Sequence, residues 1–483
     1  MPDLRLIRTF LAPQHATFAE RFSAFAAAAI APRAAPAEDA LARREARALV
    51  SLFGKGDWLR PVFELDLRAC CLARETLGEV SPLADAVFAL QALGTTPLLI
   101  AGTAAQRERW LGPIAAGEVM TAFAMTEPGA GSDVAALSTT ARREGDGWVL
   151  DGGKTLISNA GIADLYTVFA STDRDRGAKG ISCFLVPAGT PGLRFARPQV
   201  LSAPHPLGEI AFDGCRLPAE ALLGEEGRGY GLGLATLDRL RPTVAAAACG
   251  MAGRALAEAL AHVRRREQFG TPLAKFQLVQ QKLARMATGL TAARLLTYRA
   301  AFEKDEGQDR ITAEAAMAKS FATEMAQRAV DDAVQLIGGQ GVLADHPVDR
   351  LYRAVRALRI YEGTTEIQQL NIAGELLKKC GTPIRSSNIR FRQPARPPRR
   401  RRRGRAGSVR FGSAGSTWPS GPGCRRWCPG ARPRTVTSRR RCSSGTSASP
   451  GGSLARWSSR RPASAIYPAV PCSGSATTAS CPG

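Results

Sequence analysis

Glu362 is the side chain of this sequence whose setting best suits a chemical role. It lies in the segment IYEGTTEIQQL, residues 360–370, directly before Gly363. Thr365 and Gln368 have the spacing of an S/T-x-x-Q capping box, which predicts a helix that begins near Thr365. Glu362 then lies in the loop ahead of the helix, where the glycine admits close approach of a ligand. A carboxylate in this position can accept a proton, whereas the alternative is a structural acid that leads into the helix.

A turn rich in glycine and hydroxyl groups is the second feature that could bind a ligand. The segment AFAMTEPGAGSDVAAL, residues 122–137, combines Gly129 and Gly131 with the hydroxyls of Thr126 and Ser132. Exposed N–H groups and hydroxyls in a tight turn suit the polar edge of a heterocycle or a phosphate. The alternative is a plain connector between a helix and a strand.

Two later segments could meet a diphosphate or an adenosine. RREQFGTPLAKFQLVQ, residues 265–280, contains Arg266, whose planar fork matches two phosphate oxygens. QLIGGQG, residues 335–341, has paired glycines that would let a ligand approach the backbone, although a helix C-cap explains them too. The run GEEGRGYGLG, residues 224–233, lacks the ending of a P-loop and the βαβ setting of a Rossmann motif, so it is interpreted as a linker.

The elements that must position these side chains change in type along the chain. Residues 1–120 mix helix formers with charges at helical spacing. Residues 121–233 are β-rich runs cut by Gly, Pro and Asp, which predicts a barrel or a sandwich. Residues 234–380 carry long apolar stripes, which predict a four-helix bundle. The predicted fold class is therefore α+β with three domains. The β-rich runs are GWVLDGGKTLISNA (147–160), LYTVFAST (165–172), ISCFLVPAG (181–189), LRFARPQVL (193–201) and GEIAFDGCRL (208–217).

The net charge of +23 belongs to the last segment of the chain. Residues 381–483 contain 21 arginines and no lysine, aspartate or glutamate. This leaves 44 basic residues against all 42 acids in residues 1–380, which are therefore close to neutral. Because the segment has no apolar periodicity, it is predicted to be a disordered basic tail. Its composition is also typical of GC-rich DNA translated in a wrong frame.

Cysteines and apolar runs exclude several classes of protein. Six of the eleven cysteines precede residue 381, and only Cys70 and Cys71 lie close together, so no metal site is expected. Scattered thiols fit a reducing cytoplasm. The Ala-rich segment 22–35 starts too late for a signal peptide. The sequence has no apolar run of about 18 residues, so no transmembrane helix is expected.

The motif segments together resemble the acyl-CoA dehydrogenases. TEPGAGSD at residues 126–133 and YEGT at 361–364 are the most specific, and the order helices, strands, helices also matches. The resemblance covers roughly residues 15–378. It implies an FAD enzyme that forms the α,β-double bond of an acyl-CoA, with Glu362 as the catalytic base and an electron-transfer flavoprotein as the electron acceptor. It also implies a homotetramer or homodimer.

The resemblance further implies which residues bind the ligands. The acyl-CoA would be bound by Ser132, Asp238, Arg241 and Gly363. FAD would be bound by Phe123, Met125, Thr126, Ser132, Leu156, Ser158, Arg266, Phe269, Gln277, Gln335, Gly338, Gly339, Thr364 and Glu366, of which Arg266 and Gln277 would reach the FAD of a neighbouring subunit.

This chain departs from the family pattern in the flavin region. Leu156 stands where relatives usually have Trp, and Ser158 where they usually have Thr, so an aromatic wall is missing. His205 is interpreted as a loop residue. Some branches place the base near residues 237–242, where this chain offers Asp238 but no glutamate, which favours Glu362.

The expected reaction explains why a base is needed. Forming the double bond removes the α-proton and the β-hydride. The weakly acidic α-proton requires a positioned carboxylate while the thioester oxygen is polarised, by resemblance through the N–H of Glu362 and a flavin hydroxyl. The hydride passes to the flavin. Two alternatives remain: an acyl-CoA oxidase that uses O₂, and a flavin-containing, nucleic-acid-binding stress protein that uses the basic tail.

Overall fold

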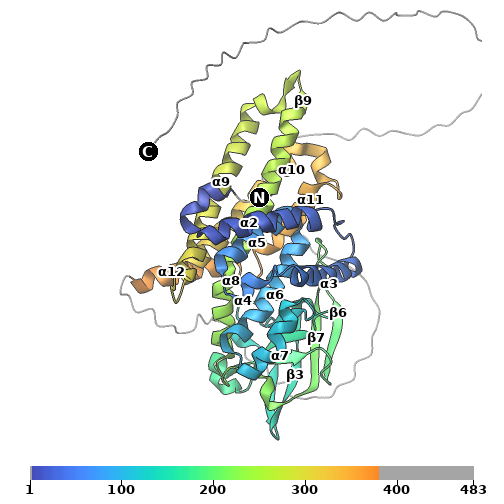
Figure 1. Ribbon diagram of the computed structural model, residues 1–483, viewed down its shortest axis with the longest axis vertical. Coiled ribbons are helices and arrows are strands. Elements are labelled where there is room, and N and C mark those ends of the chain that lie inside the picture. The colour runs from blue at the N-terminus through green and yellow to red at the C-terminus, as the bar shows by residue number, and fades with distance from the viewer. Residues whose placement is uncertain (1–2, 380–483) are drawn as a thin grey trace, which may run out of the picture. The chain divides into compact units, whose positions relative to one another are not determined.

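The computed structural model describes residues 3–379, which form three runs of elements in the expected order (Figure 1). Helices give way to strands after residue 120, and helices return at residue 229. The predicted basic tail, residues 381–483, lies outside the described residues. The predictions that this segment is disordered, or translated in a wrong frame, therefore concern residues that the structure does not describe.

The N-terminal run consists of helices with clear start signals. Ser81 accepts a hydrogen bond from the N–H of Ala84 at the start of α6, and Thr103 forms a capping box with Gln106 at the start of α7. The helices are α1 (Leu4–Ile7), α2 (Pro13–Phe25), α3 (Asp39–Lys55), α4 (Arg60–Phe63), α5 (Leu67–Val80), α6 (Pro82–Ala101) and α7 (Ala104–Ala115).

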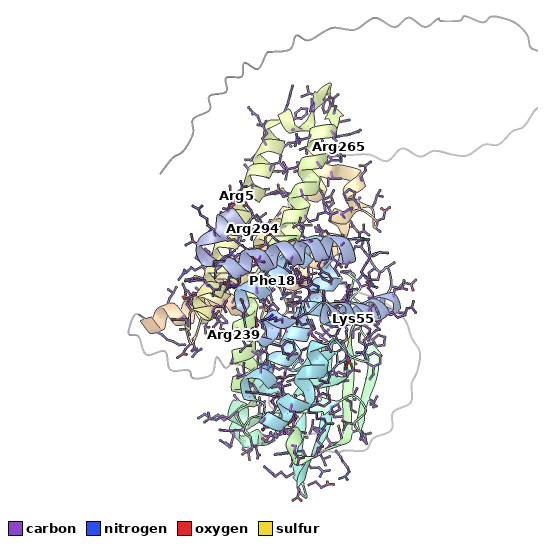
Figure 2. All side chains as sticks on the ribbon, in the orientation of Figure 1. Arg5, Phe18, Lys55, Arg239, Arg265 and Arg294 are labelled. Carbon is purple, nitrogen blue, oxygen red and sulfur yellow. The ribbon has the colours of Figure 1, made fainter. Side chains whose placement is uncertain are left out.

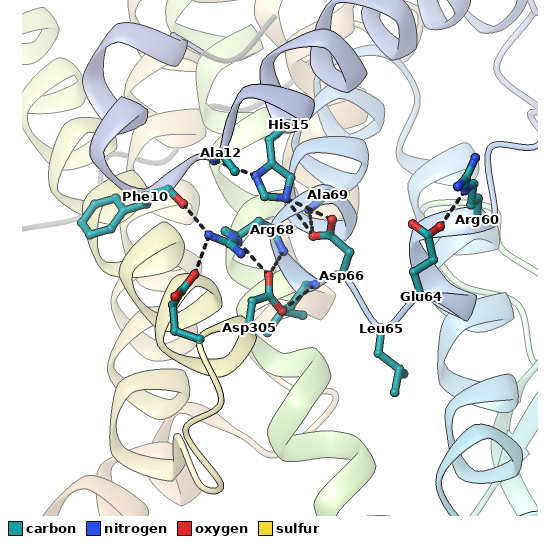
Figure 3. Close-up of polar contacts among 12 residues, drawn as sticks. Phe10, Ala12, His15, Arg60, Glu64, Leu65, Asp66, Arg68, Ala69 and Asp305 are labelled. Atoms are coloured by element: carbon teal, nitrogen blue, oxygen red, sulfur yellow. Dashed lines mark hydrogen bonds and ion pairs between the residues drawn. The ribbon is translucent and has the colours of Figure 1, made fainter.

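Two carboxylates fix the start of α5 (Figure 3). Asp66 caps this helix and lies 3.0 Å from Nε2 of the buried His15 on α2. Asp305, the last residue of α9 (Gln277–Asp305), accepts hydrogen bonds from the N–H groups of Leu67 and Arg68, both at 3.0 Å. Because free N–H groups at a helix N-terminus attract negative charge, these contacts tie α5 to both helical runs.

The strands form one path of hydrogen-bonded neighbours in the order β6-β7-β3-β2-β4-β5-β8, with β1 paired to β4. The path ends at β6 and β8, so the described strands do not close into a barrel. β2 and β4 meet at one residue pair only, Thr140 with Ser171. The bounds are β1 (Thr121–Ala124), β2 (Thr140–Glu144), β3 (Gly147–Ser158), β4 (Leu165–Ser171), β5 (Ile181–Pro187), β6 (Leu193–Pro198), β7 (Leu207–Leu217) and β8 (Leu222–Leu223). The five β-rich runs of the sequence correspond to β3 to β7.

The C-terminal run has three long helices and two shorter ones where the sequence predicted four. α10 contacts all the others, and a small hairpin separates α8 from α9. The apolar stripe of α10, predicted to be core or subunit interface, is buried at Met325, Val330 and Ile337 and exposed at Phe321. The elements are α8 (Gly229–Arg265), β9 (Glu267–Gln268), β10 (Thr271–Pro272), α9, α10 (Thr312–Ile337), a 3₁₀ segment (Gly338–Val342), α11 (Pro347–Leu358) and α12 (Thr365–Lys379).

Close packing explains the composition of the two most apolar helices. α6 and α8 are long and apolar enough to cross a membrane, but 78% and 61% of their apolar windows are buried inside the fold. α8 lies against α5, where a Cβ on Gly250 would come within 2.0 Å of the carbonyl oxygen of Glu75. The small residues of α8 therefore allow two backbones to approach each other.

Candidate active site

Glu362 lies in the loop between α11 and α12, as the sequence predicted. Its φ of 54° is rare for a residue with a side chain, and Gly363 follows with φ 90°. Its carboxylate oxygen Oε2 is buried and has no hydrogen-bond partner among the described residues. A strained backbone and an unpaired buried carboxylate oxygen in one residue point to a functional group.

The loop is held by its carbonyl groups. Arg241 Nε donates to the carbonyl of Glu362 (3.1 Å), and Lys319 Nζ donates to that of Gly363 (2.7 Å). Gln368 Nε2 donates to both carbonyls, at 3.2 and 3.0 Å. A Cβ at position 363 would lie 2.6 Å from this Gln368 nitrogen, so the loop requires glycine. The N–H of Glu362 has no acceptor within residues 3–379 and remains available to a ligand.

The helix after this loop begins at Thr365, but the predicted capping box is wrong. Thr364 is the cap, since its hydroxyl accepts a hydrogen bond from the N–H of Ile367 (3.4 Å). The hydroxyl of Thr365 instead donates to Glu324 on α10 (2.8 Å), and the side chain of Gln368 reaches the loop carbonyls. Local spacing could not show these contacts, because Glu324 lies 41 residues away. Glu366 is exposed in the first turn of α12.

The electrostatic setting of Glu362 suits a base. Burial raises the pKa of Glu362 above its usual value, and the cations Arg74, Lys319 and Arg241 oppose that shift. Arg74 is buried and pairs with Asp85 at 2.8 Å. A carboxylate with a raised pKa is a stronger proton acceptor than a solvated one, and the surrounding cations still permit it to ionise.

A cavity of about 760 Å³ opens beside the loop and is large enough for a small-molecule ligand. All the residues predicted to bind the substrate line it: Ser132, Asp238, Arg241 and Gly363. Asp238 accepts hydrogen bonds from Arg241 Nη1 (3.1 Å) and from Thr312 Oγ1 (2.7 Å). Because the Arg241 side chain is only 7% exposed, the pair belongs to the cavity wall and is not a surface ion pair.

Six of the predicted FAD residues come from two segments that a hydrogen bond holds side by side: Phe123, Met125, Thr126, Ser132, Leu156 and Ser158. The N–H of Thr155 on β3 donates to the carbonyl of Thr126 (3.0 Å). The β3–β7 register shifts between Lys154 and Ile157, and within this irregularity Leu156 has φ 56° and is 55% exposed. An exposed apolar side chain of this kind can pack against a flat ring such as that of FAD.

A buried ion pair fastens the TEPGAGSD turn to β3. Lys154 Nζ lies 2.7 Å from Glu127 Oε1, and both side chains are almost fully buried. Burial alone would raise the pKa of Glu127, but Lys154 and hydrogen bonds from Ser138 and Thr139 lower it to about 2. Met125, just before this turn, is 3% exposed, and its carbonyl accepts a hydrogen bond from Lys154 Nζ (3.4 Å).

The remaining residues of the flavin region contact protein side chains. The ring of Phe123 packs on Phe169, with 4.9 Å between centroids. The hydroxyl of Ser158 lies 2.7 Å from Nε2 of His205. Burial lowers the pKa of His205 to about 4, so its ring is neutral at pH 7. His205, predicted to be a plain loop residue, therefore supports a predicted flavin contact.

The other predicted FAD residues lie far from the Glu362 loop. At about 1.5 Å per residue, Arg265 is roughly 36 Å along α8 from Arg241, and Figure 2 labels Arg239 and Arg265 toward opposite ends of that helix. Burial, Arg266 and His346 all lower the pKa of His262, so the segments around residues 266 and 346 lie close together. The distant group comprises Arg266, Phe269, Gln277, Gln335, Gly338 and Gly339.

This distant group cannot touch a ligand in the Glu362 cavity of its own subunit. Phe269 lies at the tip of the β9–β10 hairpin and is 94% exposed. Gln277 is the first residue of α9, and Gly338 follows α10 with φ 73° and open space where a Cβ would stand. If these residues bind FAD, the FAD belongs to another subunit.

Two features that sequence reasoning missed surround Glu362. Lys319 is a lone charge in the alanine-rich stretch of α10, and that exception to the apolar pattern was the available signal. Gln368 carried no signal beyond the capping spacing. No group of three or more His, Cys, Asp or Glu side chains in the described part of the chain could hold a metal ion.

Comparisons with known proteins agree with this arrangement. The N-terminal, middle and C-terminal domain models of acyl-CoA dehydrogenase match residues 12–118, 122–215 and 227–377. The chain is 46% identical to a 3-(aryl)acrylate reductase of Clostridium sporogenes over 285 residues, which are 59% of this chain and 75% of that protein. It is 43% identical to the mitochondrial short-chain specific acyl-CoA dehydrogenase of Mus musculus over 317 residues, which are 65% and 77% of the two chains.

A solved structure shows the same fold. The butyryl-CoA dehydrogenase of Megasphaera elsdenii has a TM-score of 0.71 and 34% identity, and the match covers 76% of this chain and 99% of that one. The family is FAD-dependent, and its enzymes are oxidoreductases that act on CH–CH bonds. This chain therefore belongs to the acyl-CoA dehydrogenase family.

Proposed function

We propose that the protein introduces the α,β-double bond into an acyl-CoA thioester, with Glu362 as the base. The observation that carries the proposal is the buried, unpaired Oε2 of Glu362 beside a cavity of about 760 Å³. Gly363, the residue after Glu362, lines this cavity, so an acyl group that reaches the loop would bring its α-proton close to a carboxylate that has no competing partner. The raised pKa of Glu362 favours acceptance of that proton.

Polarisation of the thioester comes from the same loop. The N–H of Glu362 is free among the described residues and can donate to the thioester oxygen, where negative charge develops as the proton leaves. Arg241 and Gln368 hold the Glu362 carbonyl and thereby the direction of the adjoining peptide. Asp238 in turn orients Arg241.

FAD would be held by Thr126, Ser132, Leu156 and Ser158, and when bound it supplies the acceptor for the β-hydride. The Glu127–Lys154 pair and the Thr126–Thr155 hydrogen bond keep the two holding segments at a fixed spacing. The distant group around Arg266 and Phe269 would hold the FAD of a second subunit, which supports a homodimer or homotetramer.

A short acyl chain is the proposed substrate class, and an electron-transfer flavoprotein the proposed acceptor. Two relatives, a short-chain acyl-CoA dehydrogenase and a butyryl-CoA dehydrogenase, support the acyl length. A reducing cytoplasm is the proposed location, supported by five free, buried cysteines in the described part.

A second candidate function is the reverse reaction on an arylacrylate. It is favoured by the 46% identity to a 3-(aryl)acrylate reductase. The same Glu362 would then return a proton to the α-carbon. Chemically reduced protein mixed anaerobically with a 3-arylacrylate, or with its CoA thioester, should regain yellow flavin absorbance if this direction operates.

Anaerobic titration with butyryl-CoA tests the main proposal. The wild-type protein should lose its flavin absorbance within turnover time. Glu362→Gln should retain FAD, but its rate of bleaching should be at least about 10³-fold lower. Glu375→Gln, which removes a half-buried carboxylate on α12 paired with Lys378, is the matched control and should bleach normally. Bleaching by Glu362→Gln at the wild-type rate would remove Glu362 from its role. Hydrogen peroxide formed in stoichiometric amounts in air would instead favour an oxidase.

A further inference from the structure

Lys319 is a fully buried charged residue that the reaction proposed above does not use. It lies on α10 with 0% of its surface exposed. Its hydrogen bond among the described residues runs from Nζ to the carbonyl oxygen of Gly363, at 2.7 Å. Burying an ammonium group is unfavourable unless nearby groups compensate it, so a lysine at this position needs a reason beyond packing.

The contact of Lys319 acts directly on the conformation of Glu362. The Gly363 carbonyl follows Glu362 in the chain, and Arg241 and Gln368 hold the carbonyl of Glu362 itself. Donors from α8, α10 and α12 therefore fix two successive peptide groups. A non-glycine residue keeps a φ of 54° only when its surroundings impose it, and these donors impose it here.

Lys319 also differs from the other cations near Glu362. Arg74 on α5 is matched by Asp85 on α6 at 2.8 Å, and Arg241 on α8 by Asp238 at 3.1 Å. Among the described residues, Lys319 has no carboxylate within ion-pair distance. Tyr361, in the same loop, also interacts with the carboxylate of Glu362. Glu324 and Glu366 lie near the ammonium group of Lys319.

We propose that Lys319 is a positioning residue for the base: it holds Glu362 in its left-handed conformation through the Gly363 carbonyl and faces its carboxylate with an unmatched positive charge. The inference rests on the proposed function, because it gives Lys319 a role only if Glu362 takes the proton. Of the cations around the loop in residues 3–379, Lys319 alone combines both effects.

The test compares variants that separate the tether from the charge. Lys319→Met removes both, Lys319→Gln can still donate to the Gly363 carbonyl but has no charge, and Lys319→Arg keeps the charge. For Met, kcat should fall about 10-fold or more while KM changes less than about 2-fold. For Met and Gln, the acid limb of the kcat profile should move up by about one pH unit, and Arg should restore it.

A matched control and a second readout make the test independent of turnover. Lys282→Met removes a partly buried lysine on α9 that pairs with Asp332 at 2.6 Å, far from the loop, and should leave the limb in place. Infrared titration of the carboxyl group, with Glu362→Gln as the blank, should show the same upward movement of the Glu362 pKa in Lys319→Met and Lys319→Gln. Flavin content and thermal unfolding show which variants are folded.

The outcomes distinguish this inference from the proposed function. An unmoved acid limb and an unmoved infrared titration in the folded Lys319→Gln variant would overturn the inference while leaving Glu362 as the base. Normal bleaching by Glu362→Gln would overturn the proposed function instead. An equal shift in Lys282→Met would show a general effect of net charge and would also overturn the inference.

Discussion

At the scale of single residues, the pKa of Glu362 sets the pH range in which the protein is expected to be active. Burial raises this pKa above its ordinary value of 4.5, so the ionised base is lost as pH falls through that higher pKa. We expect kcat/KM for butyryl-CoA to rise with pH through an apparent pKa above 4.5. Rates measured from pH 5 to 9 check this, and a flat profile down to pH 5 would contradict the buried position of the carboxylate.

The contact between His205 and Ser158 leads to a separate prediction about cofactor affinity. His205→Phe removes the ring nitrogen that lies 2.7 Å from the Ser158 hydroxyl, so that hydroxyl is no longer oriented. We expect FAD to bind about 5-fold more weakly, the equivalent of about 1 kcal/mol for one hydrogen bond. Fluorescence of released FAD measures the affinity. In a double-mutant cycle with Ser158→Ala the effects should not add, and simple additivity would argue against coupling.

At the scale of elements, the buried Glu127–Lys154 pair sets the position of the TEPGAGSD turn on β3. Lys154→Met leaves a buried carboxylate without its cation, and we expect a loss of about 3–5 kcal/mol of unfolding free energy at pH 7. The double variant with Glu127→Gln should recover part of this loss. Urea unfolding measures both values, and a single variant as stable as the wild type would contradict the role of the pair.

The pH dependence of this pair has a definite sign. The folded-state pKa of Glu127 is about 2, below its ordinary value of 4.5. Its ionisation therefore stabilises the fold above pH 4.5, and this contribution is lost as pH falls from about 4.5 toward 2. The Lys154→Met variant should lose most of this dependence, because only the hydrogen bonds from Ser138 and Thr139 then lower the pKa of Glu127 against the effect of burial.

The β9–β10 hairpin combines backbone strain with exposure in a way that predicts assembly. Phe269 and Gly270 both have positive φ, 53° and 68°, as a two-residue type I′ turn requires. Phe269→Gly should relieve about 1 kcal/mol of strain in the subunit. If Phe269 inserts into a neighbouring subunit, the same change should shift the protein toward smaller assemblies and lower its FAD content. Sedimentation velocity measures this, and an unchanged assembly would contradict the insertion.

Local patterns predicted the elements better than the contacts between them. The β-rich runs and the helical stripes were visible because each depends on neighbours within a few residues. β1, β2 and β8 were missed, since strands of two to five residues have no clear period. Lys319 and Gly363 are hydrogen-bonded although they are 44 residues apart in the sequence, and Arg74 and Thr243 although they are 169 apart. No rule of local spacing could predict these contacts. Glu362 and the cavity residues Ser132, Asp238 and Arg241 were predicted through motif resemblance rather than through periodicity.

At the scale of the whole molecule, the charge of the chain changes sharply near residue 380. Residues 1–380 carry 44 basic and 42 acidic residues, whereas 21 of the 65 basic residues and none of the acids lie beyond. The described residues, 3–379, contain the helices α5, α8, α10 and α12 whose side chains surround the Glu362 loop. Nothing in the proposed chemistry therefore requires the basic segment.

A chain that ends at residue 380 tests this division. We expect it to bind FAD, to bleach with butyryl-CoA at the wild-type rate, and to unfold within about 1 °C of the full chain, because the cavity residues that the structure describes lie within residues 3–379. Any binding of the full chain to DNA should be lost in the shorter one, since it would depend on arginine–phosphate contacts and weaken steeply between 50 and 200 mM salt. Flavin absorbance and a DNA-binding titration at two salt concentrations measure these outcomes. A truncated chain that loses FAD, or that still binds DNA as tightly as the full chain, would show that the basic segment and the enzyme unit cannot be separated.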